Sequence, residues 1–501
     1  MSHIAFQPKG QRVDVEADYV VVGSGAGGAA AASVLARAGY KVAIVEAGPW
    51  RAPQDYPSTT YGAMRDLFDN WGLQVALGKS ISPVVQARCV GGTTVINSAI
   101  CVRTPGDIFR QWAREWGVPE QGLSASVWRH QDDLEQELCA ELVPPASRGR
   151  STELALEAAE KLGFKEHHVM TRYVKGCQGS GQCLQGCRNL TKQSTNVNLV
   201  PEVRARGGVV LSCAPVDKVV MKRGEAVGVT GRFIHPGNRS KGAGFFVRAR
   251  KGVFVAASAT YTPVILMRSG IRHPKLGHFF RAHPGAGVFG VYDEPIDMNV
   301  GATQGWASIG FRDSPGIKLE TLAIPPEMIA SRLSGGGTAL MSKLSEYRHL
   351  AMWVHSIRAE TAGRVRNLGG KPFVTYSLDL PDMHRLRAGL YLTAQMHFAA
   401  GAKAIIPGIH GLPYKLGPDD LELIKHAPLE HRRYITIMTH LFGGAVMGGD
   451  PRTSVCDPTG KVRGTRNLFV SDAAAIPTVL GVNPQHTIMG LARHFAERQV
   501  A

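Results

Sequence analysis

The chain is 501 residues long, with 44% hydrophobic and 19% charged residues and a formal net charge of +17. A positive charge of this size can serve nucleic acid, an anionic membrane surface or an acidic partner. The basic residues, however, are spread along the whole chain, without long Lys/Arg runs or a basic helix interleaved with aromatic residues. We therefore predict a solvated basic surface and no nucleic-acid partner, in a protein of about two to four domains.

The N-terminal residues Met1–Lys9 lack the apolar core of a signal peptide, and no twin arginine is present. No apolar stretch reaches the length of about 18 residues that a membrane span needs. Eight cysteines in a chain of this length are too few for a disulfide framework. The sequence thus predicts no transmembrane segment and a cytoplasmic location, with export to the periplasm alongside a partner subunit left open.

A glycine-rich turn made by Gly23, Gly25 and Gly28 follows the apolar segment 18–22 and precedes an alanine-rich segment, 29–39. This pattern predicts a buried strand, a tight turn and a helix whose N-terminus can hold a pyrophosphate. We expect Gly23 to permit the turn, Gly25 to let phosphate approach, and Gly28 to let the helix pack on the strand.

A second strand, predicted at 41–45, ends at Glu46, about 20 residues after the turn, where an acidic side chain can accept hydrogen bonds from an adenosine ribose. The unit therefore predicts dinucleotide binding rather than a merely structural turn.

The remaining elements suggest one nucleotide-binding domain interrupted by a second domain. A helix is predicted at 151–165, then strands forming a β-meander that leads into a returning core strand: 208–212, 216–220, 245–248 and 252–256. The second domain shows strand-like segments at 287–292, 351–357 and 371–378 and a helix at 385–400, before the chain returns with a strand at 467–471 and a helix from Thr487. We predict an α/β fold with a nucleotide domain at 1–280 and 431–501, and a substrate domain at 281–430.

Four further motifs carry a resemblance to a known family. They are Arg88–Asn97, Ser258–Ile271, Arg281–Pro284, and the C-terminal pair His440–Gly448 and Asn467–Pro484. In this order they are similar to the signatures of the glucose–methanol–choline (GMC) flavin oxidoreductases. The glycine-rich segment after His440 and the asparagine at position 483 lean toward the cholesterol-oxidase and long-chain-alcohol-oxidase side of that family.

The resemblance implies a Rossmann-like FAD-binding domain with a parallel sheet and β-meander, and an α+β substrate domain with an antiparallel sheet. The implied cofactor is non-covalent FAD, because the first signature carries Cys89 but no histidine of the kind that some relatives use for covalent attachment. The cofactor-binding residues that we predict are Gly23, Gly25, Gly28, Glu46, Gly91, Gly92, Thr93, Asn97, Val216, Asp472 and Pro484. Asn97 could instead be a turn residue, and Asp472 could cap a helix, bind the flavin ribityl chain, or do both.

Alcohol oxidation needs a group that takes the hydroxyl proton and a group that holds the oxygen. His440 is the predicted base, because imidazole titrates near working pH, and Asn483 is the predicted oxygen ligand. Pro484 restricts the backbone of Asn483 and precedes a helix whose positive end would favour an anionic reduced flavin. His486, Glu320 and Glu327 are weaker candidates, the two carboxylates because some relatives with cholesterol-like substrates use one in this domain.

Three cysteines, Cys177, Cys183 and Cys187, lie on a glycine-rich loop. Such a set could bind an iron–sulfur cluster or zinc, and some GMC dehydrogenases carry a three-cysteine cluster near this place. The spacing differs by one residue from the form associated with that cluster, and no fourth ligand lies nearby. We therefore favour no metal here, with buried thiols or a local disulfide instead.

The predicted function is FAD-dependent oxidation of a hydrophobic or aromatic alcohol to an aldehyde or ketone, with oxygen, a quinone or a redox protein as electron acceptor. One alternative is lyase or decarboxylase chemistry on the same FAD fold. Another is a nicotinamide-dependent dehydrogenase, which would leave the Gly91–Asn97 loop, His440 and Asn483 without a role. A non-enzymatic basic binding protein is disfavoured by the same residues.

Overall fold

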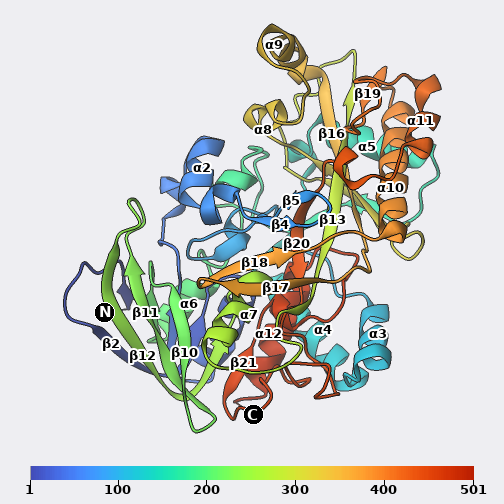
Figure 1. Cartoon of the computed structure of the whole chain (residues 1–501). Helices are drawn as coiled ribbons and strands as arrows, with labels where there is room; N and C mark the ends of the chain where they lie inside the picture. The colour runs from blue at the N-terminus through green and yellow to red at the C-terminus, as the bar shows by residue number, and fades with distance from the viewer. Residues whose placement is uncertain (1, 501) are drawn as a thin grey trace.

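A computed structural model describes residues 2–500 and contains two large β-sheets flanked by helices (Figure 1). The first sheet has eight strands in the order β1-β9-β3-β2-β12-β11-β10, with β21 also paired to β12. Their bounds are His3–Ile4, Val209–Leu211, Val42–Val45, Val13–Val22, Lys241–Val255, Glu225–Ile234, Val216–Lys222 and, for β21, Leu468–Val470. Strands β1, β9, β3, β2, β12 and β21 pair in parallel, whereas β10, β11 and β12 pair antiparallel. The predicted parallel sheet and meander are therefore confirmed.

Strand β12 joins the two halves of this sheet. Its 15 residues pair with β11 from Lys241 to Arg248 and with β2 from Phe245 to Val255, and a register irregularity separates Ala249 from Gly252. We predicted two separate strands here, at 245–248 and 252–256. The structure has one strand, because Ala249 still pairs with Ala17 and the ladder resumes at Gly252 after the irregularity at Arg250 and Lys251.

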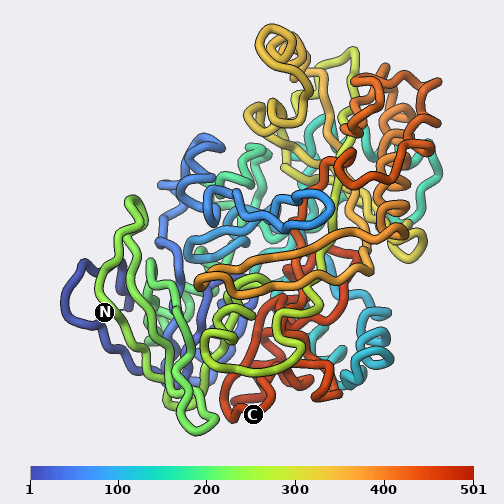
Figure 2. The backbone as a smooth tube through the Cα atoms, in the orientation of Figure 1, coloured from blue at the N-terminus to red at the C-terminus, as the bar shows by residue number. Residues whose placement is uncertain are grey.

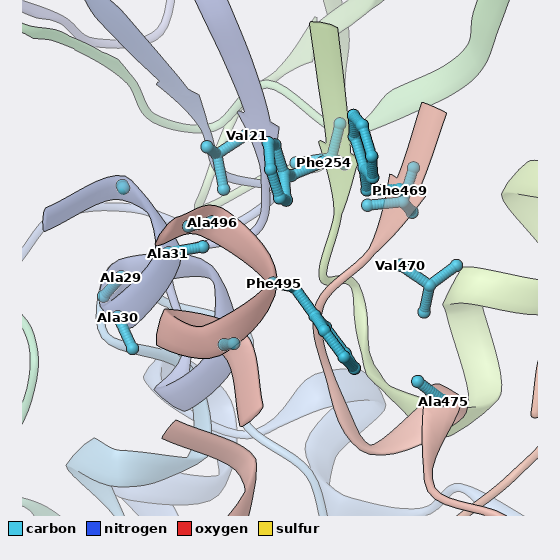
Figure 3. Packing of buried hydrophobic residues seen from close by; sticks show 14 of the residues in the cluster. Val21, Ala29, Ala30, Ala31, Phe254, Phe469, Val470, Ala475, Phe495 and Ala496 are labelled. Atoms are coloured by element: carbon cyan, nitrogen blue, oxygen red, sulfur yellow. The ribbon is translucent and has the colours of Figure 1, made fainter. Parts of the chain in front are cut away.

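The core of this part lies between the sheet and two helices, α1 (Ala26–Arg37) and α12 (Gln485–Glu497). Figure 3 shows alanines of α1 and Phe495 of α12 in one cluster with sheet residues, among them Val21, Phe254 and Val470. Small side chains on α1 let the two helices approach closely, so the last helix of the chain covers the same sheet as the first. The α12 helix begins two residues before the predicted Thr487, and α1 begins at Ala26 because Gly25 is its N-cap.

The second sheet has eleven strands, ordered β5-β4-β18-β17-β13-β16-β15-β14-β7, with β19 and β20 paired to β13. The bounds are Ile81–Pro83, Val75–Leu77, Lys371–Thr375, Gly363–Leu368, His278–Val291, Leu350–Ile357, Ile317–Leu322, Trp306–Ser308 and His167–Val169, then Ala404–Ile406 for β19 and Ile437–Phe442 for β20. All pairs are antiparallel except β4 with β18. The sheet is thus mainly antiparallel, as predicted, and α10 (Leu380–Ala399) packs on β13 and β16.

From β13 on, the chain builds most of the second sheet, and near its C-terminal end it returns to the first sheet through β21, a path that Figure 2 follows by colour. Strands β4, β5, β7 and β20 of the second sheet come from outside residues 281–430. The domain division at 281 and 430 stays a prediction, and this strand pairing links the two parts more closely than that division suggests.

The segment 51–150 contains two helices of more than ten residues, α3 (Gly106–Trp116) and α4 (Glu120–Glu137). The helix predicted at 151–165 is α5 (Arg150–Lys161), and the second family signature forms α7 (Ser258–Arg268). Among the described residues, no helix is both long enough and apolar enough to span a membrane.

Candidate active site

The Gly23–Gly28 turn shows why each glycine is needed. Gly23 has a φ of +100°, and a Cβ there would lie 2.3 Å from the carbonyl oxygen of Ala256. A Cβ on Gly28 would lie 2.1 Å from the carbonyl oxygen of Gly23, so this residue brings the helix against the turn. At Gly25 the nearest heavy atom to a Cβ is Cα of Gly92, 3.9 Å away. The turn and packing roles are built into the structure, and the open space at Gly25 suits an approaching phosphate.

Glu46 follows strand β3 and is buried beside the turn. Its carboxylate accepts hydrogen bonds from the Ser24 hydroxyl (2.7 Å), the Ser24 amide (3.1 Å) and the Gly48 amide (2.8 Å). Burial raises the pKa of Glu46, while these donors act in the opposite direction. The side chain lines the central cavity, so the predicted ribose contact is available, but the carboxylate also holds the turn in shape.

The Gly91–Asn97 loop packs directly on the glycine turn. The Gly91 amide donates to the Ser24 hydroxyl (2.9 Å), and a Cβ on Gly92 would lie 2.8 Å from Cα of Gly25. Residues Gly92–Val95 form a short 3₁₀ helix whose Thr93 lines the cavity. Asn97 lines it too, donates to the Gln485 side chain (2.6 Å) and accepts from the Ala99 amide (3.0 Å). The turn role of Asn97 is therefore present, and its cofactor contact stays a prediction.

Asp472 caps the 3₁₀ helix Ala473–Ala475, accepting from the Ala474 amide at 2.8 Å. It also accepts from the amide of Ser258 (2.7 Å) and the hydroxyl of Thr262 (2.6 Å), both on α7. Burial raises the pKa of Asp472 to about 6. The capping role is thus observed, and the residue lines the cavity where a ribityl hydroxyl could reach it.

One cavity of about 1380 Å³ connects Gly23, Gly25, Glu46, Gly92, Thr93, Asn97 and Asp472 with His440 and Asn483, whereas the predicted Gly28 and Gly91 do not line it. Its wall includes the Gly23 turn, Val216 at the start of β10 and Pro484, the N-cap of α12. The volume exceeds the roughly 300–1,000 Å³ of an ordinary small-molecule pocket, which leaves room for a dinucleotide and a second molecule.

A cluster of polar side chains closes the far end of this cavity. His440 comes from β20, Glu320 and Lys318 from β15, and Asn483 from the segment that leads into α12. The Asn483 amide nitrogen lies 3.2 Å from Oε1 of Glu320 and 3.4 Å from Nε2 of His440. The two residues predicted to be catalytic are therefore neighbours, although 43 positions separate them in the chain.

Lys318 fixes the charges of this cluster. Its ammonium group donates to Glu320 (2.6 Å) and to the side-chain oxygen of Asn483. Lys318 and Glu320 lie two residues apart on one strand, so both side chains leave the same face. Burial favours a higher pKa for Glu320, but Lys318, His440 and the hydrogen bonds outweigh it and leave the pKa lowered. Because an ammonium only donates, the Asn483 oxygen must face Lys318, and its NH₂ group faces Glu320 and His440.

His440 has a buried histidine as its second neighbour. Its Nδ1 lies 3.2 Å from Nδ1 of His283, on the adjacent strand β13. Ala282 pairs with Leu441 and Pro284 pairs with Met438, and the irregularity between these pairs places His283 beside His440. Burial lowers the pKa of His440 to about 4, so its ring is neutral near pH 7.

Comparison with known proteins identifies the family of this chain. Two family models, both described as GMC oxidoreductase, match residues 17–285 and 362–492. This chain belongs to the GMC oxidoreductase family. An uncharacterised GMC-type oxidoreductase of Mycobacterium tuberculosis is 34% identical over 491 residues, which cover 97% of this chain and 76% of that protein. The long-chain-alcohol oxidase FAO3 of Arabidopsis thaliana is 24% identical, over 96% of this chain and 67% of its own length.

Solved structures of formate oxidase and of pyridoxine 4-oxidase share the fold of this GMC oxidoreductase. The TM-scores are 0.75 and 0.71, each at 16% identity, with 97% and 96% of this chain and 98% of each of those chains covered. The family places the chain among oxidoreductases that act on CH–OH donors, with FAD as the cofactor.

The residues present fit FAD in this GMC oxidoreductase. The open approach at Gly25 and the adjacent N-terminus of α1 suit a pyrophosphate, and Glu46 suits an adenosine ribose. Further along the same cavity, Thr93, Asn97 and Asp472 would hold the flavin half. Backbone groups dominate one end and ionisable side chains the other, which matches a cofactor that binds at one end and reacts at the other.

Two weaker candidates lie away from the reacting end. His486 is buried against the Tyr173 hydroxyl and Glu135 (3.1 Å) and does not line the cavity. Glu327 is exposed in the short helix α8 (Pro326–Ala330) and does not line it either. Glu320, by contrast, belongs to the cluster. Sequence reasoning missed Lys318, whose alternation with Glu320 was the available signal, and it treated His283 only as part of a motif.

The three loop cysteines surround a buried arginine. Arg172 donates to Cys183 Sγ (3.0 Å) and Cys177 Sγ (3.8 Å), and its Nε donates to the carbonyl of Ser98 on the cavity wall (2.6 Å). Burial would raise the pKa of Cys183, but Arg172 and Lys192 bring the pKa down to about 7. All eight cysteines are free, so the disulfide alternative is wrong. The thiol interpretation and the cluster alternative both stay predictions.

Proposed function

We propose that this GMC oxidoreductase oxidises an alcohol to an aldehyde or ketone, with His440 and Asn483 acting at the carbinol. The observation that carries the proposal is the single cavity that runs from the Gly23 turn to His440, Asn483 and Glu320. Bound FAD supplies the hydride acceptor. The residues of the chain must then hold the substrate oxygen and accept its proton.

Asn483 is suited to hold the oxygen. Lys318 takes its carbonyl oxygen, so the NH₂ group stays available to donate to an alkoxide that develops as hydride leaves carbon. Two groups beside it can handle the proton, Nε2 of His440 and the carboxylate of Glu320. The pKa values of both groups are lowered, so near pH 7 His440 is neutral and Glu320 is ionised. These are the protonation states in which each group can accept a proton.

The proposed substrate is hydrophobic or aromatic. The wall near the cluster is formed by apolar side chains of the second sheet and its loops: Leu322, Ile324, Met328, Met352, Val354 and Ile437. A wall of this kind favours an aliphatic or aromatic body and offers few partners to a sugar's hydroxyl groups. The alcohol oxidase FAO3 named above acts on long-chain alcohols, which agrees with this proposal.

FAD is proposed to bind without a covalent bond. Cys89, in the first signature loop, is buried in a small cluster with Tyr56 and Leu67 rather than lining the cavity. Burial also raises the pKa of its thiol. We expect acid precipitation of the protein to release all flavin into the supernatant.

We further propose a cytoplasmic location, which the free state of the cysteines supports.

The test is anaerobic titration of the purified protein with a panel of aliphatic, aromatic and sugar alcohols. We expect a flavin absorption spectrum that bleaches with hydrophobic alcohols and yields a stoichiometric carbonyl product. A protein without flavin that reduces NAD would support the nicotinamide alternative, and product formation without bleaching would support a lyase. Reoxidation of the bleached flavin by air, by a quinone analogue or by neither then distinguishes oxygen, a quinone and a redox protein as acceptor.

A further inference from the structure

The protonation of the paired histidines is determined by a backbone amide. The N–H of Gly481 donates to Nε2 of His283 at 2.9 Å. A backbone N–H can only donate, so this ring nitrogen must be the acceptor. A neutral imidazole carries one proton, and that of His283 must therefore sit on Nδ1.

The proton position on His283 also determines the tautomer of His440. With its proton on Nδ1, His283 donates across the 3.2 Å contact to Nδ1 of His440. That nitrogen is then an acceptor, and the single proton of neutral His440 lies on Nε2. The reverse arrangement would place two hydrogens between the rings or leave His283 with no proton at all.

The surroundings keep both rings neutral, as the argument requires. His283 is buried, and its burial, with His440, Lys318 and Arg312 nearby, holds its pKa well below the ordinary value. Arg312 itself donates to the carbonyl of Leu480 (2.8 Å), next to Gly481, and so anchors the segment that carries the donating amide. Burial lowers the pKa of His440, and Glu320 raises it only in part.

We propose that His283 is a positioning residue that locks His440 in the tautomer with the proton on Nε2. In this state His440 presents a donor to the cavity and does not take up the substrate proton. This inference rests on the proposed function for its chemical meaning, but the tautomer itself belongs to the protein without substrate.

The locked tautomer assigns the roles in the cluster. Nε2–H of His440 and the NH₂ group of Asn483 are both donors and lie 3.4 Å apart, so they do not satisfy each other. An alkoxide oxygen placed between them would accept from both. Glu320 then remains as the proton acceptor: within the described residues both of its hydrogen-bond donors, Lys318 and Asn483, use Oε1, and Oε2 stays available. This carboxylate would accept the proton of the substrate hydroxyl, and bound FAD would supply the hydride acceptor for the carbinol carbon.

The test compares two isosteric variants of the FAD-loaded enzyme, His283→Asn and His283→Leu. Asparagine can restore an N–H donor toward Nδ1 of His440, whereas leucine fills the same space without one. ¹⁵N NMR of histidine-labelled protein reports which ring nitrogen is protonated, and His440→Gln identifies the signal. Flavin content and melting temperature check that each variant is folded, and stopped-flow absorbance measures flavin reduction by an alcohol.

We expect wild-type His440 to be protonated on Nε2, with His283→Asn keeping that signal. We expect His283→Leu to lose the single tautomer of His440 and to slow flavin reduction at least about tenfold. In the molecules with the proton on Nδ1, His440 has no N–H group directed at the substrate oxygen. A wild-type proton on Nδ1, or equal spectra and rates for the two variants, would overturn the proposal. If leucine prevents folding, the wild-type spectrum alone decides. If no alcohol bleaches the wild-type flavin, the proposed function fails, while the NMR result still tests His283.

Discussion

The two ends of the cavity are built in different ways. At the Gly23 end the shape comes from backbone: a positive φ, close backbone packing and the amides of a turn that one short stretch of sequence encodes. At the His440 end it comes from side chains on β13, β15, β20 and the segment before α12, which lie far apart in the chain. In the proposed function, a turn encoded by one short segment binds the cofactor, and side chains brought together by the whole fold carry out the chemistry. Substitutions at the Gly23 end should abolish cofactor binding or leave it intact, whereas substitutions at the His440 end should slow the reaction to different degrees.

The strongest way to break the backbone end is Gly23→Ala. The methyl group would meet the Ala256 carbonyl at 2.3 Å in a left-handed conformation, which we expect to cost about 3 kcal/mol or more from strain and overpacking. The purified variant should contain almost no FAD, as measured by its absorption spectrum. Gly25→Ala is the matched control: its Cβ meets no atom closer than 3.9 Å, so the fold should persist while FAD binding weakens. Full flavin content in Gly23→Ala would contradict this account of the turn.

At the side-chain end, the largest effect is expected from His440→Ala. Flavin reduction should slow by at least about 100-fold, because a donor or acceptor at the reacting oxygen is lost. The FAD content should remain normal, since His440 lies far from the glycine turn within the same cavity. Rapid-mixing absorbance under anaerobic conditions gives the rate. Near-normal reduction would remove His440 from the chemistry.

A somewhat smaller effect is expected from Glu320→Gln, about 100-fold or less on flavin reduction, because the amide cannot accept the proton. The exposed Glu327 provides the control, and Glu327→Gln should leave the rate unchanged. Similar rates for the two variants would show that Glu320 is not the proton acceptor.

The smallest expected effect is on the pH profile. The pKa of His440 is lowered from 6.5 to about 4 by burial, so the neutral ring persists well below pH 6.5. We expect kcat/KM to stay level down to about pH 5 and to fall as the pH drops through about 4. The free energy of unfolding should also fall as the pH drops. The unfolded chain protonates this histidine near pH 6.5 and the folded chain only near pH 4, so the contribution of the neutral ring to stability is lost between pH 6.5 and 4. An acid limb centred near 6.5 would mean that His440 is more hydrated than its position indicates.

The comparison also explains what the sequence could predict. The dinucleotide turn, the meander, the parallel strands and the antiparallel second sheet follow from short-range patterns, and the structure confirms them. His440 and Asn483 were found through motifs, because pattern alone cannot show that β20 lies beside the N-terminus of α12. The alternation of Lys318 with Glu320 was visible in the sequence, but the contact of Lys318 with Asn483 and the pairing of His283 with His440 could not be predicted, since both join segments that are distant in the chain.

The irregularity between β13 and β20 has a consequence for the evolution of this chain. Between the Ala282–Leu441 and Pro284–Met438 pairs, β13 has one residue, His283, and β20 has two, Thr439 and His440. A one-residue deletion in β20 there would remove the irregularity and turn the side chains on one side of it to the other face of the sheet. Length variation near residues 439–440 should therefore yield folded, flavin-loaded proteins with altered chemistry, which makes this short stretch a place where the fold can be kept while its reaction is changed.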